Sequence, residues 1–265
     1  MAPQRSQPIY PEWQDPASRR TGTLYIVGTP IGSFDDLSIR ALNTLKNVSI
    51  VAAENPLATQ ALLDHHGISA TITSYGPRNH DEKISVLLHA LHRGQHVALV
   101  SDSGMPVIYD PGRLLIAAAQ QAGYPVTVIP GPSALTAAVA ISGYSGDRVH
   151  FEGKFPRTKR LANRFLAHFK GNSVTLVFFA PSAHCAHILQ SLHRILPDRQ
   201  VTLATDMTRT TERLCQGTAA SLLAQGRPLA ENAEVTVVVE GEPPKGVRRT
   251  RLRATRHATR RRGAE

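Results

Sequence analysis

Three loops that combine glycine, proline and polar residues hold the side chains best suited to chemistry. They read GTPIG at residues 28–32, SDSGMPVIYDPG at 101–112 and PGPSA at 130–134. Glycine lets a backbone approach a ligand closely, and proline lowers the entropy cost of keeping a loop open. The carboxylate of Asp102 can accept hydrogen bonds from an amine or a hydroxyl. Ser133, with the backbone amides that begin the next helix, suits a ligand carboxylate.

Each loop taken alone is also consistent with an ordinary turn between a strand and a helix. Three such loops at corresponding strand ends favour a ligand site instead. The first loop lacks the GxGxxG spacing of a dinucleotide site, and Pro30 removes an amide donor that a phosphate cradle would use. No GxxxxGK[ST] motif occurs in the chain. Cofactors rich in phosphate are therefore poorly supported.

Short apolar strands precede all three loops, at 23–27, 96–100 and 125–129. Other segments alternate between strand-like runs and apolar residues at helical spacing, which predicts a parallel sheet with helices on both faces. In such a sheet, ligands bind beyond the carboxyl ends of the strands. The further strands are expected at 49–53 and 71–74, and the helices at 37–45, 56–66, 80–92, 112–121 and 133–142.

The regular alternation breaks in a segment rich in glycine and basic residues. We therefore predict an N-terminal α/β domain at 23–142, a linker region at 143–160 and a C-terminal α/β domain at 161–244. Two such domains would place a ligand in the cleft between them. In the second domain, helices are expected near 161–169 and at 184–195, and strands at 174–179, 201–205 and 234–239.

Length and composition limit the classes of protein to which the chain can belong. The chain has 265 residues, 42% of them apolar, and no apolar run long enough to cross a bilayer. Its beginning lacks the apolar region of a secretory signal, and its two cysteines cannot form a disulfide framework. The scattered histidines show no metal-ligand spacing. We expect a cytoplasmic protein without a metal site.

The positive charge is concentrated at the C-terminal end. Residues 245–265 hold nine Lys and Arg residues against one Glu, which gives +8 of the formal +10. Clustered like charges stay disordered, and Arg-rich tails bind phosphate backbones. The sequence therefore predicts a basic disordered tail at 245–265, and we also expect a disordered N-terminal extension at 1–22. Arg248 and Arg249 of this tail are candidate RNA contacts, although a purely solubilising tail is the alternative.

The loops also carry a family resemblance. LYIVGTPIG, VALVSDSGMPVIYDPG and PVTVIPGPSALTAAVAISG, followed by FEGKFPR, resemble the tetrapyrrole-methylase-like class III methyltransferases that use S-adenosylmethionine. Within this class the chain is similar to the small-subunit rRNA methyltransferase I family. The resemblance implies two α/β domains, a methyl donor in the interdomain cleft and a homodimer. It also implies 2′-O-methylation of a cytidine of 16S rRNA in the small ribosomal subunit.

The resemblance assigns cofactor contacts to particular residues of this chain. They are Pro30 and Ile31 in the first loop, Asp102, Gly104, Met105 and Pro106 in the second, Ser133 and Ala134 in the third, and Phe179 and Ala180 after a strand of the second domain.

The sequence also departs from the family pattern on the acceptor side. AENPL at 53–57 stands where the family usually has alanine-glutamate-aspartate-threonine-arginine. APSAH at 180–184 replaces glutamate-serine-proline-histidine-arginine. Two alternatives therefore remain open: a methylase of a tetrapyrrole or another small metabolite, and a non-catalytic relative that binds RNA or the ribosome.

Methyl transfer from a sulfonium is an in-line displacement, so its main requirement is alignment of the reacting atoms. A base near the acceptor hydroxyl could take its proton. Glu54 is the candidate catalytic residue and Asp102 the alternative, although Glu54 could equally be an acid at a helix start.

Four basic residues near the expected cleft form a second group of candidate RNA contacts, for which a solvated surface is the alternative. They are Lys154, Arg157, Lys159 and Arg160.

Overall fold

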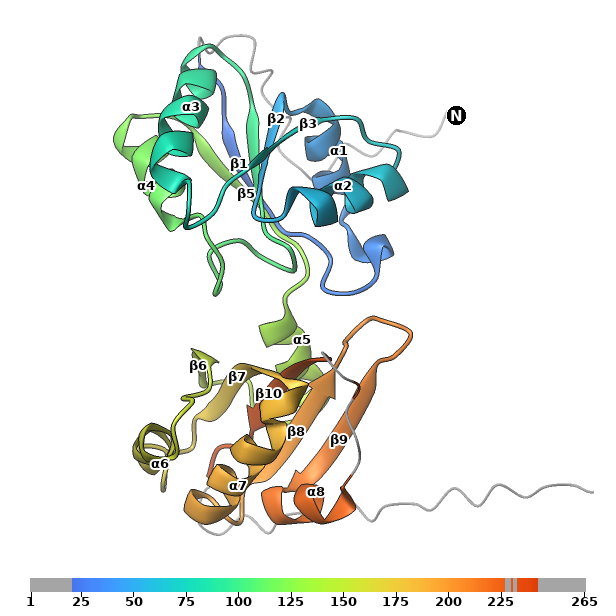
Figure 1. Ribbon diagram of the computed structural model, residues 1–265, viewed down its shortest axis with the longest axis vertical. Helices are drawn as coiled ribbons and strands as arrows, with labels where there is room; N and C mark the ends of the chain where they lie inside the picture. The colour runs from blue at the N-terminus through green and yellow to red at the C-terminus, as the bar shows by residue number, and fades with distance from the viewer. Residues whose placement is uncertain (1–20, 227–229, 231–232, 243–265) are drawn as a thin grey trace, which may run out of the picture.

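The computed structural model describes residues 21–226, 230 and 233–242. Two α/β domains lie one above the other, and each is built around its own five-stranded sheet (Figure 1). The predicted two-domain α/β fold is confirmed. The extension expected at 1–22 falls outside the described residues except for its last two positions, and the tail expected at 245–265 falls outside them entirely.

The first sheet is parallel throughout, with the strand order β3-β2-β4-β1-β5. Its strands are short, and β1 and β4 are apolar and buried along their whole length. A parallel strand covered on both faces needs such a continuous apolar run. The strands are β1 (Leu24–Val27), β2 (Ile50–Ala53), β3 (Thr71–Ser74), β4 (Val97–Val100) and β5 (Val126–Ile129).

Helices cover both faces of this sheet, as the sequence predicted. One face packs against α1 and α2 through residues such as Leu45 and Leu63. The opposite face packs against α3 and α4 through residues such as Leu91 and Leu115. The helices are α1 (Ile39–Asn47), α2 (Pro56–His65), α3 (His80–His92) and α4 (Arg113–Gln121), and the short 3-10 turn η2 (Phe34–Asp36) precedes α1.

The strand order brings the three unusual loops together. The loops follow β4, β1 and β5, which are adjacent in the sheet, and the carboxyl ends of parallel strands lie at one edge. From β1 the chain continues to β2, which lies on one side of β1 in the sheet. From β4 it crosses over β1 to β5, which lies on the other side. Such a reversal of strand order is the position at which open α/β sheets bind ligands.

The second sheet is mixed and has the order β6-β7-β10-β8-β9. β6 and β7 are parallel, whereas the other neighbours are antiparallel. The strands are β6 (Val149–Lys154), β7 (Thr175–Pro181), β8 (Gln200–Thr205), β9 (Arg213–Thr218) and β10 (Glu234–Val239). The helices are α5 (Ala134–Ser142), α6 (Lys159–Ala167), α7 (Cys185–Ile195) and α8 (Ala219–Gln225), with the 3-10 turn η3 (Ser182–His184) before α7.

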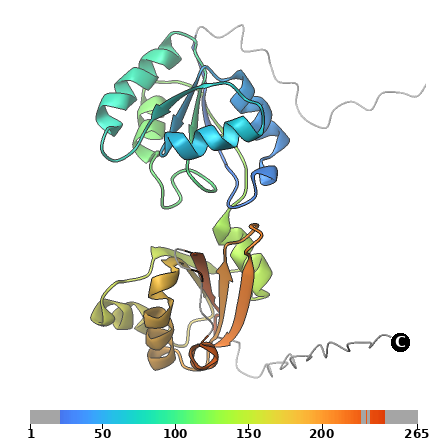
Figure 2. The same ribbon diagram turned by 45° about the vertical axis from the view of Figure 1, so that its right-hand side comes forward.

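The helices divide unequally between the faces of the second sheet. α6, α7 and α8 pack on one face, where Leu166, Leu192 and Leu222 join the largest core cluster. α5 packs on the other face (Figure 2), where Ala138 belongs to one core cluster with Val177 and Val238. The chain therefore enters the second domain at α5, directly after the loop that follows β5.

Four elements differ from the sequence-based expectation. The segment 143–160, expected as a linker region, contains the edge strand β6, while β9 and α8 were not predicted. β6 and β9 are edge strands whose polar, partly exposed residues lack a buried apolar run. α5, which was expected to close the first domain, packs on the second sheet because its sequence ALTAAVAIS is apolar on nearly every side.

A second contact joins the domains beside α5. The backbone N–H of Ser33, in the loop after β1, donates to the Thr208 hydroxyl at 2.9 Å. Ile31 of the same loop packs in one core cluster with Met207, which follows β8. The loop after β1 is therefore held by both domains.

Candidate active site between the two domains

The three loops contact one another through their backbones. The Thr29 N–H donates to the Gly104 carbonyl at 2.9 Å, and the Thr29 hydroxyl lies 3.1 Å from the Ser101 carbonyl. Gly28 packs so closely on Gly131 that a Cβ at either position would lie 2.7 Å from backbone atoms of the other. These contacts hold the three loops as one unit at the edge of the sheet.

The loop between β4 and α4 has an unusual backbone. Gly104 has φ 82° and Gly112 has φ 139°, while Val107 and Tyr109 also have positive φ, at 77° and 72°. Positive φ is costly for residues with a side chain, above all for a β-branched residue such as Val107. Strained backbone of this kind tends to occur at functional sites, where the surrounding contacts hold it in place.

A cavity of about 400 Å³ lies between the domains, against these loops. The first domain contributes the loop residues Ser103, Gly104, Met105, Ile108, Tyr109 and Asp110, and Ser133 and Ala134 line it at the start of α5. The second domain contributes Lys154, Phe179, Ala180, Pro181, Ala233, Glu234, Val235 and Thr236. The cavity is large enough for a drug-sized ligand and combines apolar walls with a few polar groups.

The start of α5 opens onto this cavity. Ser133 is the N-cap residue, and its side chain makes no capping hydrogen bond. The first N–H groups of a helix have no partner within the helix, and the helix dipole makes this end attractive to anions. The cavity therefore offers an uncommitted hydroxyl and free amide donors where a ligand carboxylate could bind.

Aromatic and basic side chains join the domains across the cavity. The Lys154 ammonium lies 4.7 Å from the centroid of the Tyr109 ring, a cation–π contact. The rings of Tyr109 and Phe179 have centroids 6.5 Å apart in an edge-to-face arrangement, and Phe151 packs 4.9 Å from Phe179. Tyr109 thus connects the strained loop of the first domain to β6 and β7 of the second.

Three carboxylates gather near the loops. Asp102 accepts a hydrogen bond from the Asn55 N–H at 3.1 Å. Partial burial and then the charge of Asp102 raise the pKa of Glu54 above its usual value. Burial raises the pKa of Asp110 to about 6, with further increases from Glu54 and Asp102 and a decrease from a hydrogen bond to Ser101. Burial first, and nearby negative charge second, disfavour the ionised form of Asp110, which is why its pKa lies above that of a free carboxyl group.

The predicted cofactor residues fall into two groups. Six of the ten line the cavity: Gly104, Met105, Ser133, Ala134, Phe179 and Ala180. The other four lie in the same loops without lining it: Pro30, Ile31, Asp102 and Pro106. Glu54, the predicted catalytic residue, lies exposed at the end of β2 and also does not line the cavity.

Two cavity residues whose side chains could take part in binding or catalysis, Asp110 and Tyr109, were not predicted from the sequence. The available signal was the YDPG sequence at 109–112, in which a carboxylate sits directly before a proline and a helix start. The importance of this sequence depends on the positive φ of Tyr109. No local sequence pattern reveals this backbone conformation.

A second cavity of about 380 Å³ adjoins the first and shares Lys154, Phe179, Ala180 and Pro181 with it. Arg157 and His184 also line this second cavity. Lys159 and Arg160 are exposed in the first turn of α6. The predicted basic group at 154–160 thus borders the cavity region, whereas Arg248 and Arg249 lie outside the described residues.

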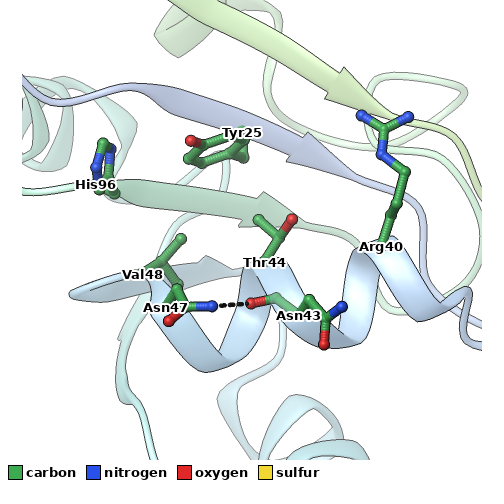
Figure 3. A pocket seen from close by; sticks show the side chains of 7 residues that line it. All are labelled: Tyr25, Arg40, Asn43, Thr44, Asn47, Val48 and His96. Carbon is green, nitrogen blue, oxygen red and sulfur yellow. Dashed lines mark hydrogen bonds between the residues drawn. The ribbon is translucent and has the colours of Figure 1, made fainter. Parts of the chain in front are cut away.

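A third cavity, of about 340 Å³, lies along α1, away from the loops (Figure 3). Its lining includes Arg40, Asn43 and Asn47, and the Asn47 amide donates to the Asn43 carbonyl at 2.7 Å. None of the three loops contributes to it, and it therefore plays no part in the candidate site.

The departure at 53–57 leaves local structure intact. Asn55 is the N-cap of α2, and its side-chain oxygen accepts from the N–H groups of Leu57 and Ala58 at 3.1 and 3.3 Å. Pro56 occupies the first helical position, where proline is favoured. Leu57, by contrast, is 83% exposed and contributes no polar group.

Within the described ranges, no group of three or more His, Cys, Asp or Glu side chains could hold a metal ion. No helix in the same part of the chain is long and apolar enough to cross a membrane. Cys185 is buried and Cys215 half-buried, and both are free thiols.

The sequence and the fold both match known proteins. The Tetrapyrrole (Corrin/Porphyrin) Methylases family matches residues 23–223. A Thermotoga maritima protein named Ribosomal RNA small subunit methyltransferase I is 38% identical over 83% of this chain and 99% of its own. A protein of the same name from Xylella fastidiosa is 37% identical over 83% of this chain and 82% of its own.

Two solved structures share the fold at low sequence identity. The uroporphyrin-III C-methyl transferase from Thermus thermophilus, complexed with S-adenyl homocysteine, gives a TM-score of 0.56 at 19% identity and covers 83% of this chain and 98% of that one. The methyltransferase CobJ gives 0.63 at 18% identity and covers 83% and 95%. Together with the sequence relatives, these matches show that the chain belongs to the tetrapyrrole methylase family and, within it, to the ribosomal RNA small subunit methyltransferase I group.

Proposed function

We propose that this protein transfers a methyl group from S-adenosylmethionine to the rRNA of the small ribosomal subunit. The observation that carries the proposal is the interdomain cavity, which the loop after β4, the start of α5 and the second domain line in a chain 38% identical to a small-subunit rRNA methyltransferase I. The acceptor we propose is the 2′-hydroxyl of a cytidine of 16S rRNA.

The lining of the cavity fits the chemistry of this methyl donor. The uncommitted Ser133 hydroxyl and the amide of Ala134 suit the donor's carboxylate. The backbone at Phe179 and Ala180 suits the edge of an adenine, and Gly104 and Met105 approach from the first domain. Pro30, Ile31, Asp102 and Pro106 belong to the proposed donor site as parts of the loops that form it.

The protein's task in this reaction is alignment. The bound donor supplies an electrophilic methyl group on a positively charged sulfur. The loops, which contact one another through their backbones, would hold the donor between the two domains, so that binding supplies the in-line geometry. A base near the acceptor hydroxyl could take its proton as the new bond forms. The candidates are the three clustered carboxylates, among which Glu54 was the choice from sequence.

The basic residues beside the cavities are the proposed RNA contacts. Lys154 and Arg157 line the second cavity, and Lys159 and Arg160 extend the positive surface along α6. Cationic side chains position a nucleic acid through its phosphates. Arg248 and Arg249 are proposed to add contacts from the basic tail.

We also propose a cytoplasmic homodimer. The edge strand β5 exposes Val128 to 54%, and an unpaired apolar edge favours association with a second copy. Analytical ultracentrifugation at micromolar concentration should give twice the chain mass of 28.7 kDa. A single species at the chain mass would contradict the dimer and leave the methyl-transfer proposal intact.

A transfer assay tests the function. The purified protein and labelled methyl donor are incubated in parallel with small ribosomal subunits lacking the modification, with naked 16S rRNA and with a metabolite extract. Label in the rRNA of the subunits, mapped to a cytidine ribose, is expected. Label confined to the extract would indicate a small-molecule methylase, and RNA binding without label would indicate a non-catalytic relative.

Truncation after Pro244 tests the tail. If residues 245–265 bind phosphates, RNA affinity should fall, and the slope of its logarithm against the logarithm of salt concentration should flatten. The change is roughly 0.7 for each phosphate of single-stranded RNA that the tail no longer neutralises. Affinity for the methyl donor should not change, because the proposed donor site lies in the two folded domains. An unchanged salt slope would indicate that the tail does not bind RNA and serves only to keep the protein soluble.

A further inference from the structure

Asp110 occupies a constrained position in the wall of the interdomain cavity. It lies half-buried in the loop between β4 and α4, after Tyr109 at φ 72° and before Pro111. A residue before proline is restricted to extended conformations, and Gly112 at φ 139° is then the N-cap residue of α4. The backbone on both sides of Asp110 is thus restricted, and Asp110 is one of the residues that line the cavity.

The other two carboxylates of the cluster are placed differently. Glu54 is exposed at the end of β2, and Asp102 is exposed and accepts the Asn55 N–H through Oδ1. Neither lines the cavity, whereas Asp110 does. Of the three carboxylates, Asp110 is therefore the one in reach of a molecule bound between the domains.

The charges around Asp110 come from four elements. Glu54 follows β2, Asp102 lies in the same loop as Asp110, Lys154 ends β6, and Glu234 begins β10. Burial is the main cause that raises the pKa of Asp110 to about 6, and the charge of Glu54 is the second. A hydrogen bond to Ser101 lowers this pKa. A base is most effective when its pKa lies near the working pH, because it is then both ionised and able to hold a proton.

We propose that Asp110 is the base that accepts the proton of the acceptor hydroxyl and that Glu54 is a positioning residue that tunes it. As the hydroxyl oxygen forms its bond to the methyl carbon, the carbon–sulfur bond breaks and its electron pair stays on the sulfur. The hydroxyl proton passes to the Asp110 carboxylate, which later releases it to water. This inference rests on the proposed methyl-transfer function.

Single-turnover rates of methyl transfer to small ribosomal subunits, measured from pH 5 to 9, test it. Wild type should show a rate that rises with pH and levels off above an apparent pKa near 6. Asp110→Asn should lower the rate at pH 8 by about 10²- to 10⁴-fold and abolish the rise, since a base is lost. Glu54→Gln should keep the rise but move it to lower pH, because a negative charge that raises the pKa of Asp110 is gone.

Two controls separate this role from a structural one. Calorimetric titration with S-adenosylhomocysteine at pH 8 should give Asp110→Asn an affinity within about threefold of wild type, since the substitution keeps the shape of the side chain. Asp64→Asn, at the far end of α2 where the exposed carboxylate only accepts from Gln60, should retain the wild-type pH profile.

The outcomes are distinguishable. If Glu54→Gln abolishes the pH dependence and Asp110→Asn keeps it, Glu54 is the base and the inference is overturned. An unchanged rate in Asp110→Asn also overturns the inference. In both cases the methyl transfer measured with the wild type still supports the proposed function. Absence of transfer by the wild type overturns the proposed function itself, and this inference falls with it.

Discussion

Gly28 and Gly131 join the loops after β1 and β5 by direct backbone contact: a Cβ on Gly28 would lie 2.7 Å from both the Cα and the N of Gly131. β1 and β5 are neighbouring parallel strands, so their loops leave the sheet side by side. The close approach brings the start of α5, and with it Ser133, over the edge of the first sheet. Glycine is required at both positions because any side chain would push the loops apart.

Gly28→Ala should therefore weaken both folding and ligand binding. The added methyl group also meets the Met105 sulfur at 2.6 Å; the Met105 side chain can move away, but the contacts with the Gly131 backbone require the loops to shift. We expect a loss of about 1–3 kcal/mol in the free energy of unfolding, the usual cost of overpacking, and a lower affinity for S-adenosylhomocysteine. Denaturant unfolding and calorimetry measure the two effects.

Gly76→Ala is the matched control, because no atom lies within 4 Å of its added Cβ and its backbone needs no positive φ. It should unfold like wild type and bind with wild-type affinity. Equal stability and affinity in Gly28→Ala and Gly76→Ala would show that the loop contact does not shape the site.

Removal of the Tyr109 ring should loosen the join between the domains. The ring contacts Lys154 of β6 and Phe179 of β7 across the cavity. Tyr109→Ala removes both interactions, which are together worth about 1–2 kcal/mol, so affinity for S-adenosylhomocysteine should fall by roughly tenfold. Tyr109→Phe keeps the ring and should bind as wild type does. A comparable loss of affinity in both variants would implicate the hydroxyl instead of the ring.

Asp110→Asn should raise stability in a pH-dependent manner. Burial raises the pKa of Asp110 from 3.8 to about 6, so the folded state disfavours the charged form. As the pH rises from about 4 to 6, the unfolded chain releases this proton while the folded chain holds it, and wild type loses stability through that window. The variant has no such loss. Its melting temperature should exceed that of wild type at pH 8, and the two should converge below pH 4; a constant difference over the whole range would contradict the assignment.

Arg199 stabilises the second domain from within. Its guanidinium is buried and donates to the carbonyls of Glu240, Phe169 and Asn172 at 2.7, 3.0 and 3.0 Å, and it lies 2.8 Å from the Glu242 carboxylate. These bonds tie the end of β10 to the loop after α6. Arg199→Leu leaves the carbonyls without donors and should cost about 3 kcal/mol or more in the free energy of unfolding.

Arg194→Ala, which removes an exposed arginine from the last turn of α7, should change that free energy by less than about 1 kcal/mol. A similarly small change in Arg199→Leu would mean that water replaces the guanidinium without loss.

The first domain was largely predictable because its strands and helices repeat a local pattern. β4 is an apolar run ended by Ser101, and α3 follows its apolar spacing from His80 to His92. The second domain was less so. β9 carries the polar sequence RLCQGT, and its partner β8, not its own composition, makes it a strand.

The site divides in the same way. Gly104, Met105, Ser133 and Ala134 were assigned through the family resemblance, on loops that also stand out in composition, and all four line the cavity. Asp110 was not, because its relevance arises from burial, from the charge of Glu54 and from the turn at Tyr109. These are tertiary properties, which a single sequence does not display.

The central claim is that the cavity between the domains binds the methyl donor, and calorimetric titration with S-adenosylhomocysteine tests it most directly. Ala134 lines the cavity in the first turn of α5, whereas Ala140 is exposed on the same helix. Wild type and Ala140→Leu should bind one molecule per chain with equal affinity. Ala134→Leu, whose larger side chain enters the cavity, should bind at least about tenfold more weakly, which corresponds to about 1.4 kcal/mol in binding free energy. No binding to wild type at millimolar concentration, or equal binding by both variants, would contradict the account.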